Sequence, residues 1–324
     1  MSLQVNRLSK RVGDKWILRD VSFEAERGKI LGLFGVSGSG KTVILRAIAG
    51  IDKSAGGTVL FDSKNVTDLS SDARNFHLSR PAKNSIFTKI MKSARSALLS
   101  GGERAVAVFD EALQSRCSLL LLDDSFRPMD SFMKDESFAK LRRIAEGQNI
   151  AVVFATNNYE DVLALCDSVA ILNGGEIGQT GMPQGVYSEP NSFAVARITG
   201  RNNLFEARRL TSSKSENPLF QTLAGEHRLG VEKMKLSSLG ALNQTVWLGI
   251  RPEHISIAFE ASFPEDNLLK AKVTGVHMLG PTTLVELNSG GLILEALVLR
   301  LVGLNIGDEC MLGIPPNRIQ VFRN

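Results

Sequence analysis

The chain of 324 residues has little cysteine, little histidine, few aromatic side chains and no long apolar run. Its 3 cysteines and 4 histidines lie far apart, without the paired spacing of a disulfide framework or a zinc site. No apolar segment approaches the roughly 20 residues that cross a bilayer as a helix, and we expect no cleaved leader. Any membrane span that serves this protein is therefore expected on another polypeptide.

Charge of one sign is also scarce. The formal net charge is +4, which is too small to argue for a nucleic-acid partner, and we expect none. Hydrophobic residues make up 43% of the chain and charged residues 22%, as in ordinary folded proteins. The length is sufficient for two hydrophobic cores, so we expect two domains.

One segment carries a clear chemical signal. Residues 35–42 read Gly-Val-Ser-Gly-Ser-Gly-Lys-Thr, the G-x-x-x-x-G-K-[ST] pattern of a phosphate-binding loop. A flexible glycine turn is the alternative, but a predicted buried strand at 29–34 and a predicted helix at 43–49 flank the segment as such a loop requires. Glycines let backbone amides curl toward an anion, and the helix start adds partial positive charge. The predicted ATP-binding residues are Gly35, Val36, Ser37, Gly38, Ser39, Gly40, Lys41, Thr42 and Val43.

An acidic strand end gives the second signal. Residues 118–122 form an apolar run typical of a central parallel strand, and Asp123 follows at its carboxyl end, where ligands bind in open α/β sheets. We expect Thr42 and Asp123 to hold Mg²⁺, and Lys41 to bridge phosphate oxygens. A solvated turn at Asp123 and Asp124 is the alternative.

A third segment, Leu99-Ser100-Gly101-Gly102-Glu103, lies between these two motifs. With all three in this order, the chain resembles the ATP-binding subunit of an ABC transporter, of the importer subfamily for molybdate or tungstate, iron, polyamines or sugars. The resemblance implies an α/β P-loop ABC-type ATPase domain followed by an all-β OB-like (TOBE/MOP-like) domain. It also implies a homodimer in which Ser100, Gly101 and Gly102 cap the partner's ATP. A plain helix N-cap at Ser100 is the alternative.

The resemblance further implies transmembrane permease subunits and a solute-binding protein as partners, and a peripheral place at the cytoplasmic face of the membrane. Cargo would be a solute such as an oxyanion. Thr282 and Thr283 can offer hydroxyls to an oxyanion in the second domain, although threonine pairs are common β-formers.

Several family positions are altered. Asp124 replaces the glutamate that polarises the attacking water, and Asn157 replaces the switch histidine. No glutamine occurs between Thr42 and Glu103 to link Mg²⁺ to the transport interface, and the interval 43–99 is short for the helical subdomain. We therefore predict that Lys41, Asp124 and Asn157 are the catalytic residues, and that the chain by itself hydrolyses ATP slowly or not at all.

The aromatic residue that stacks on adenine is also missing. Val12 stands at its place, and Trp16 is a possible substitute, with core or edge packing as the alternative.

The pattern along the chain changes near residue 203. We place an ABC-type domain at 1–202, with antiparallel strands in 1–25 and an exit helix and linker at 193–205. Residues 130–146 are expected to form an amphipathic helix with Phe132, Leu141 and Ile144 among its apolar positions. We place a β-rich regulatory domain at 203–324. Its expected strands are 219–224, 227–232, 245–251, 268–277, 282–287, 291–298, 309–314 and 318–322.

Three functions remain open at this point. The chain is an energy-coupling importer subunit, a hydrolysis-deficient nucleotide-binding regulatory protein derived from that family, or a soluble ABC-type ATPase that acts on nucleic acid or in translation. The missing catalytic groups favour the second, and the β-rich region favours the first.

Overall fold

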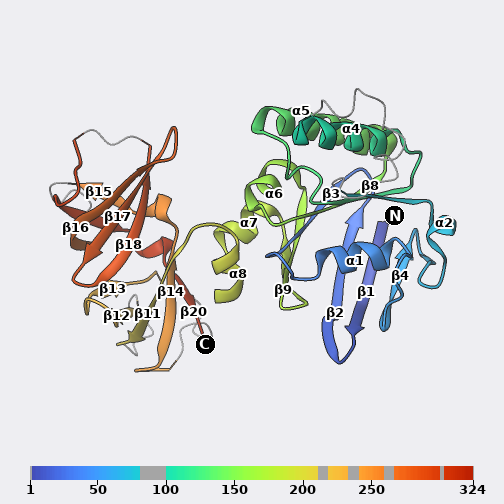
Figure 1. Ribbon diagram of the computed structural model, residues 1–324. Coiled ribbons are helices and arrows are strands. Elements are labelled where there is room, and N and C mark those ends of the chain that lie inside the picture. Colours follow the sequence, from blue (N-terminus) through green and yellow to red (C-terminus); the bar gives the residue numbers. More distant parts are fainter. Residues whose placement is uncertain are drawn as a thin grey trace. The chain divides into compact units, whose positions relative to one another are not determined.

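A computed structural model describes residues 2–80, 100–210, 218–232, 241–258, 266–299 and 303–323. The chain forms two compact units, Met1–Ser188 and Glu189–Asn324 (Figure 1). The expected boundary after residue 202 falls between helix α8 (Phe193–Ile198) and strand β11, which begins at Asn203.

The first unit opens with a four-stranded antiparallel sheet in the order β2-β1-β4-β5. Alternate residues of β2 are buried, as expected for a sheet that covers a core on one face. The antiparallel strands predicted in residues 1–25 are thereby confirmed. The strands are β1 (Ser2–Val12), β2 (Lys15–Glu26), β4 (Gly56–Phe61) and β5 (Lys64–Asn65).

A six-stranded sheet in the order β10-β9-β3-β8-β7-β6 carries the predicted motifs. All neighbours are parallel except β10, which returns antiparallel from β9 through the predicted turn at 173–175. Strands β3, β7 and β8 are buried along their whole length, because both faces of this sheet are covered. The strands are β3 (Ile30–Phe34), β6 (Phe76–Ser79), β7 (Leu119–Asp123), β8 (Ala151–Thr156), β9 (Ser168–Asn173) and β10 (Glu176–Gly181).

Two helical layers cover this sheet. On one face of the six-stranded sheet, helix α1 and the antiparallel sheet pack against it and form one hydrophobic core. On the other face, Phe126 contacts three further phenylalanine rings at centroid distances of 5.0 Å: Phe109, Phe138 and Phe154. Helices α4 and α5 lie side by side there (Figure 1). The helices are α1 (Lys41–Ile48), α2 (Ser71–Arg74), α4 (Gly101–Gln114), α5 (Ser131–Gln148), α6 (Tyr159–Leu165) and α7 (Pro183–Ser188).

Helix α5 corrects one prediction. Leu141 is fully buried as expected, and Ile144 is half-buried, but Phe132 is 70% exposed. Nine residues, or about two and a half turns, separate Phe132 from Leu141, so the two side chains face opposite ways. The buried stripe instead runs through Phe138, Leu141 and Ala145.

The second unit consists of two five-stranded antiparallel sheets, β13-β12-β11-β14-β20 and β15-β19-β16-β17-β18, which share one hydrophobic core. Its strands are β11 (Asn203–Arg209), β12 (Leu219–Thr222), β13 (Arg228–Gly230), β14 (Thr245–Ile250), β15 (Ser256–Ala258), β16 (Asn267–Met278), β17 (Thr283–Ser289), β18 (Leu292–Val298), β19 (Glu309–Ile314) and β20 (Gln320–Phe322), with short 3-10 turns at Pro252–His254 and Pro316–Arg318.

All eight strands predicted in this unit are present, with bounds shifted by up to two residues. Strands β11 and β15 were not expected. The predicted linker at 193–205 is wrong at its end, because residues from Asn203 already pair with β14. Thr283 is buried at 8% exposure and is therefore a packed strand residue, whereas Thr282 is partly exposed.

Candidate functional site

The turn after β3 is shaped by three glycines. Gly38 and Gly40 have left-handed φ values of +82° and +108°, a region that side chains other than glycine rarely adopt. At Gly35 a Cβ atom would lie 2.5 Å from the Leu172 carbonyl oxygen and 2.7 Å from Ser39 Oγ. The loop therefore requires glycine where the sequence has it. Gly40 is the N-cap of α1, and no side chain caps the amides of the first turn.

Lys41 is folded back over this loop. Its Nζ donates hydrogen bonds to the carbonyl oxygens of Gly35, at 2.7 Å, and Val36, at 3.1 Å. The side chain is only 7% exposed, and this burial lowers the Lys41 pKa, while the charges of Asp124 and Asp123 oppose the shift. An ammonium held among acceptor oxygens at a helix start is placed to meet an anionic phosphate.

Thr42 and Asp123 are brought together as the sequence predicts. The Thr42 hydroxyl lies 2.9 and 3.1 Å from the two Asp123 carboxylate oxygens. Asp123 ends β7 and is 8% exposed. The solvated-turn alternative is therefore wrong for Asp123.

Asp124 is the next residue and has an unusual backbone. Its φ is +50°, in the left-handed region, and its amide donates to the Ala155 carbonyl oxygen at 2.9 Å. Burial raises the pKa of this carboxyl, and Asp123 adds to the shift, whereas Lys41 and Arg127 oppose it. Among the described residues, no group donates a hydrogen bond to the buried Oδ1 atom.

Asn157 follows β8 and reaches the same loop. Its Nδ2 donates to the hydroxyl of Ser37 at 3.1 Å, although the two residues are 120 positions apart. The amide can donate to a phosphate oxygen, but it cannot carry a proton as histidine does.

The segment Ser100–Gly102 begins helix α4. Ser100 Oγ accepts from the Glu103 amide at 3.2 Å, and Glu103 Oε2 accepts from the Ser100 amide at 2.7 Å. This reciprocal capping box confirms the N-cap alternative. A Cβ atom at Gly101 would meet open space, whereas one at Gly102 would lie 2.9 Å from Met133 Sδ. The trans-ATP contact stays a prediction.

Sequence reasoning missed Arg80. It follows β6, which runs parallel beside β7, and its Nε lies 3.4 Å from Asp123 Oδ2. The interval 43–99 has no glutamine, but it places an arginine at the end of the strand next to β7. The order of the strands was the signal that would have found it, because adjacent parallel strands end side by side.

The oxygen donors of Thr42 and Asp123 match the chemistry that Mg²⁺ prefers. The charge around them does not, since the Arg80 guanidinium already neighbours the Asp123 carboxylate. The oxygen donors of Thr42 and Asp123 therefore suit Mg²⁺, but the positive charge of Arg80 beside them does not. Elsewhere in the described residues no cluster of three or more His, Cys, Asp and Glu side chains could hold a metal.

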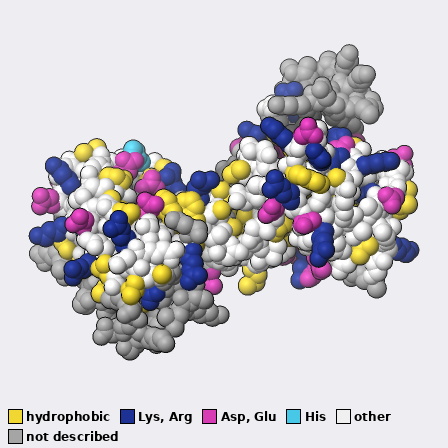
Figure 2. Space-filling model, turned by 90° about the horizontal axis from the view of Figure 1, so that it is seen from below, with side chains coloured by type: hydrophobic (Ala, Val, Ile, Leu, Met, Phe, Trp, Pro, Cys, Tyr) yellow, Lys and Arg dark blue, Asp and Glu magenta, His cyan; other side chains and the backbone are white. Residues whose placement is uncertain are grey.

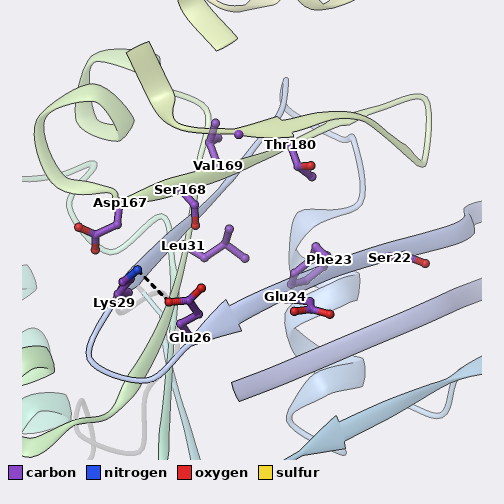
Figure 3. Close-up of a pocket in the computed structure, with 11 residues that line it drawn as sticks. Ser22, Phe23, Glu24, Glu26, Lys29, Leu31, Asp167, Ser168, Val169 and Thr180 are labelled. Atoms are coloured by element: carbon purple, nitrogen blue, oxygen red, sulfur yellow. Dashed lines mark ion pairs between the residues drawn. The ribbon is translucent and has the colours of Figure 1, made fainter. Parts of the chain in front are cut away.

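A separate pocket of about 380 Å³ contains none of the predicted site residues (Figure 3). Lys29 and Glu26 form an ion pair of 2.8 Å in it, and Asp167 accepts hydrogen bonds from the Ile30 amide and from Arg142. Its charged groups are thus already engaged within the fold.

Two family descriptions match this chain: "ABC transporter" over residues 18–82 and "TOBE domain" over residues 248–322. The chain carries an ABC transporter domain followed by a TOBE domain. The ABC match contains the loop at 35–42 and ends before Ser100. The predicted ABC-type ATPase domain followed by a TOBE-like domain is thereby confirmed.

Relatives of this ABC–TOBE chain cover nearly its whole length. A sulfate/thiosulfate import ATP-binding protein of Bacillus cereus is 28% identical over 366 residues, covering 99% of this chain and 98% of the relative. A molybdate/tungstate import ATP-binding protein of Pyrococcus horikoshii is 28% identical over 363 residues and 99% of both chains. A spermidine/putrescine import ATP-binding protein of Haemophilus ducreyi is 25% identical, covering 91% and 85%.

Solved structures share the fold of the ABC domain. A nucleotide-free ATP-binding cassette from an ABC transporter matches with a TM-score of 0.54 at 18% identity, covering 62% of this chain and all of its own. A bacterial Atm1-family ABC exporter with ATP bound matches with a TM-score of 0.52 at 16% identity, covering 61% of this chain and 41% of its own.

Trp16 lies at the outer strand of the antiparallel sheet of the ABC domain and is 47% exposed. The Arg11 guanidinium carbon is 5.9 Å from its ring centroid. Trp16 is therefore an edge residue and not a core residue. Its stacking on adenine stays a prediction.

No helix in the described parts of the ABC–TOBE chain combines the length and apolarity needed to cross a bilayer. The face seen in Figure 2 mixes lysine and arginine with aspartate and glutamate among its described residues. That face does not form one extended basic surface.

Proposed function

We propose that this chain is the ATP-binding subunit of an ABC importer, which binds ATP at residues 35–42 and closes as a homodimer. The observation that carries the proposal is the convergence of Lys41, Thr42 and Asp123 at one edge of the parallel sheet. A buried ammonium over a ring of loop carbonyls and amides is suited to a polyphosphate and to few other ligands.

The residues have distinct roles in this proposal. Amides of the loop and of the first turn of α1 donate to phosphate oxygens, and Lys41 turns from the carbonyls of Gly35 and Val36 toward the phosphates. Asn157 donates to the terminal phosphate. Gly101 and Gly102 of the second copy approach from the other side, since their amides begin a helix.

ATP that binds the closed dimer more tightly than the open one shifts the population toward closure, and loss of the terminal phosphate reverses that shift. In this proposal the chain lies at the cytoplasmic face of the membrane, and its closure moves membrane-embedded permease subunits. A solute-binding protein delivers the cargo. We propose an oxyanion as cargo. Support comes from the names of the sulfate/thiosulfate and molybdate/tungstate import relatives, although a spermidine/putrescine import relative covers much of the chain too.

A second function, a nucleotide-binding protein with little hydrolysis, is favoured by Asp124 and Asn157. The Asp124 carboxylate is one methylene shorter than glutamate, and its backbone is held at a φ of +50°. A general base raises the rate of a reaction by about 10²–10⁴-fold, and most of this gain is lost when the base is misplaced. We therefore propose slow hydrolysis as the property of the isolated subunit.

Calorimetric titration with ATP tests the binding proposal. We expect the native chain to bind and Lys41→Ala to bind at least about tenfold more weakly, as befits the loss of a charged donor. Lys64→Ala, which changes an exposed lysine of β5, is the matched control and should bind like the native chain. Equal binding by native protein and Lys41→Ala contradicts the proposal. Steady-state phosphate release at ordinary transporter rates contradicts the proposal of slow hydrolysis but leaves the proposal of ATP binding intact.

A further inference from the structure

The side chain of Arg80 lies next to Asp123 and brings a positive charge to this carboxylate. Strands β6 and β7 are parallel, and Ser79 pairs with Leu122, so Arg80 and Asp123 end adjacent strands side by side. The Arg80 Nε lies 3.4 Å from Asp123 Oδ2. This places a guanidinium beside the carboxylate that was expected to hold the metal.

Part of this guanidinium is available to a ligand. The Arg80 side chain is 37% exposed, yet its Nε and Nη2 atoms are buried and donate no hydrogen bond to any described group. Nε is in ion-pair distance of Asp123, and Nη2 has no hydrogen-bond acceptor among the described groups. Buried donors that lack a hydrogen bond are unfavourable, so rotation of the partly exposed guanidinium onto phosphate oxygens would be favourable. A guanidinium presents forked donors that suit a phosphate group.

The charges of the site also disfavour a second cation. Asp123 is 8% exposed and already accepts from Thr42 and pairs with Arg80. A divalent ion on this carboxylate would share it with the guanidinium. Like charges that approach one another in a partly buried site repel strongly, because solvent screens them less than it does at the surface.

We propose that Arg80 supplies the cation of this phosphate site, so that ATP binding does not require Mg²⁺. The proposal rests on the proposed function, since it assumes that residues 35–42 bind ATP. Arg80 would donate to the phosphate oxygens while it remains paired with Asp123, and Lys41 would contact them from the loop.

The test is calorimetric titration of the full chain with ATP, once with excess Mg²⁺ and once with EDTA. For the native chain we expect affinities that agree within about threefold between the two conditions. For Arg80→Gln we expect binding in EDTA to weaken at least about tenfold, with Mg²⁺ restoring most of the loss. Arg80→Lys keeps the charge without the fork and should fall between them.

Arg116→Gln removes an exposed arginine just before β7 and is the matched control, expected to behave as the native chain. Thermal unfolding without nucleotide checks that each variant is folded. Native binding that weakens about tenfold or more in EDTA overturns the proposal, even if Arg80→Gln does not fold. The proposal is also overturned if folded Arg80→Gln and the native chain bind ATP with equal affinity in EDTA.

These outcomes differ from a failure of the proposed function. ATP binding that requires Mg²⁺ and Lys41 leaves the nucleotide site intact and removes only the role of Arg80. Absence of ATP binding in both conditions overturns both proposals.

Discussion

The Thr42 hydroxyl donates to the carboxylate of Asp123 at 2.9 Å, across 81 positions of sequence. One residue lies in the first turn of α1, and the other ends β7. This hydrogen bond joins the phosphate loop to the acidic strand end. It therefore contributes to holding the two motifs next to each other.

We predict that Thr42→Val lowers the free energy of unfolding by about 1–2 kcal/mol, because a hydrogen bond to a charged acceptor is lost. Thr42→Ser retains the hydroxyl and should lose less. Urea unfolding of the three proteins measures the difference. If the valine and serine variants unfold alike, the hydrogen bond does not contribute as the distance suggests.

The buried Asp124 makes stability depend on pH. Burial raises the pKa of its carboxyl in the folded chain above the ordinary value of 3.8, so the folded state holds its proton more tightly than the unfolded state. The free energy of unfolding therefore falls as pH rises from about 3.8 to the folded pKa and is constant above it.

Asp124→Asn cannot ionise, so this fall should disappear. The stability of the variant relative to the native chain should rise across that pH range and then level off, measured by urea unfolding at a series of pH values. Asp135→Asn, which alters an exposed residue of α5, controls for the loss of one charge. If the free energies of unfolding of Asp124→Asn and the native protein differ by the same amount at every pH, the pKa of Asp124 is not raised in the folded state.

Restoration of the altered catalytic positions should raise hydrolysis. Asp124→Glu combined with Asn157→His lengthens one carboxylate and supplies a group that carries a proton, so we expect phosphate release to increase by about 10²-fold. Glutamate at a φ of +50° costs some stability, and unfolding should be measured in parallel. Lys41→Ala in the same background is the control and should return the rate to the background level. An unchanged rate in the folded double variant shows that more than side-chain length limits the reaction.

Gly101 and Gly102 provide a matched pair for the dimer contact. Gly101→Ala adds a methyl group in open space, whereas Gly102→Ala brings a Cβ atom within 2.9 Å of Met133 Sδ and 3.3 Å of the Pro128 carbonyl oxygen. Gly101→Ala should therefore leave the stability of the single chain unchanged, and Gly102→Ala should reduce it by about 1–3 kcal/mol.

If both glycines approach the partner's phosphates, Gly101→Ala should nevertheless weaken ATP-dependent dimerisation, as sedimentation velocity with and without ATP would reveal. Dimerisation of Gly101→Ala that equals that of the native chain contradicts a close backbone approach at this residue.

Much of the nucleotide site could be predicted because its motifs are local. The loop at 35–42 needs only contiguous residues, as its glycine φ values at Gly38 and Gly40 show. The capping box of Ser100 and Glu103 spans four residues. The meeting of Thr42 with Asp123 followed from a general property of parallel sheets, namely that strand ends and helix starts share one edge.

Other features depended on packing. Helical periodicity places Phe132 and Leu141 on opposite faces of α5, and contact of Phe138 with Phe126 decides that the face of Leu141 is the buried one. Asn203 was assigned to a linker, although pairing with β14 makes it strand. In both cases the partner is distant in sequence.

The amino-acid sequence by itself determined the phosphate loop, the acidic strand end and the change from an α/β to an all-β pattern, because backbone conformation and hydrophobic period act over a few neighbouring residues. Only the tertiary structure decided that Arg80 lies beside Asp123 and that Asn157 reaches Ser37. Those contacts follow from strand order, and strand order is set by how the whole sheet buries its two faces.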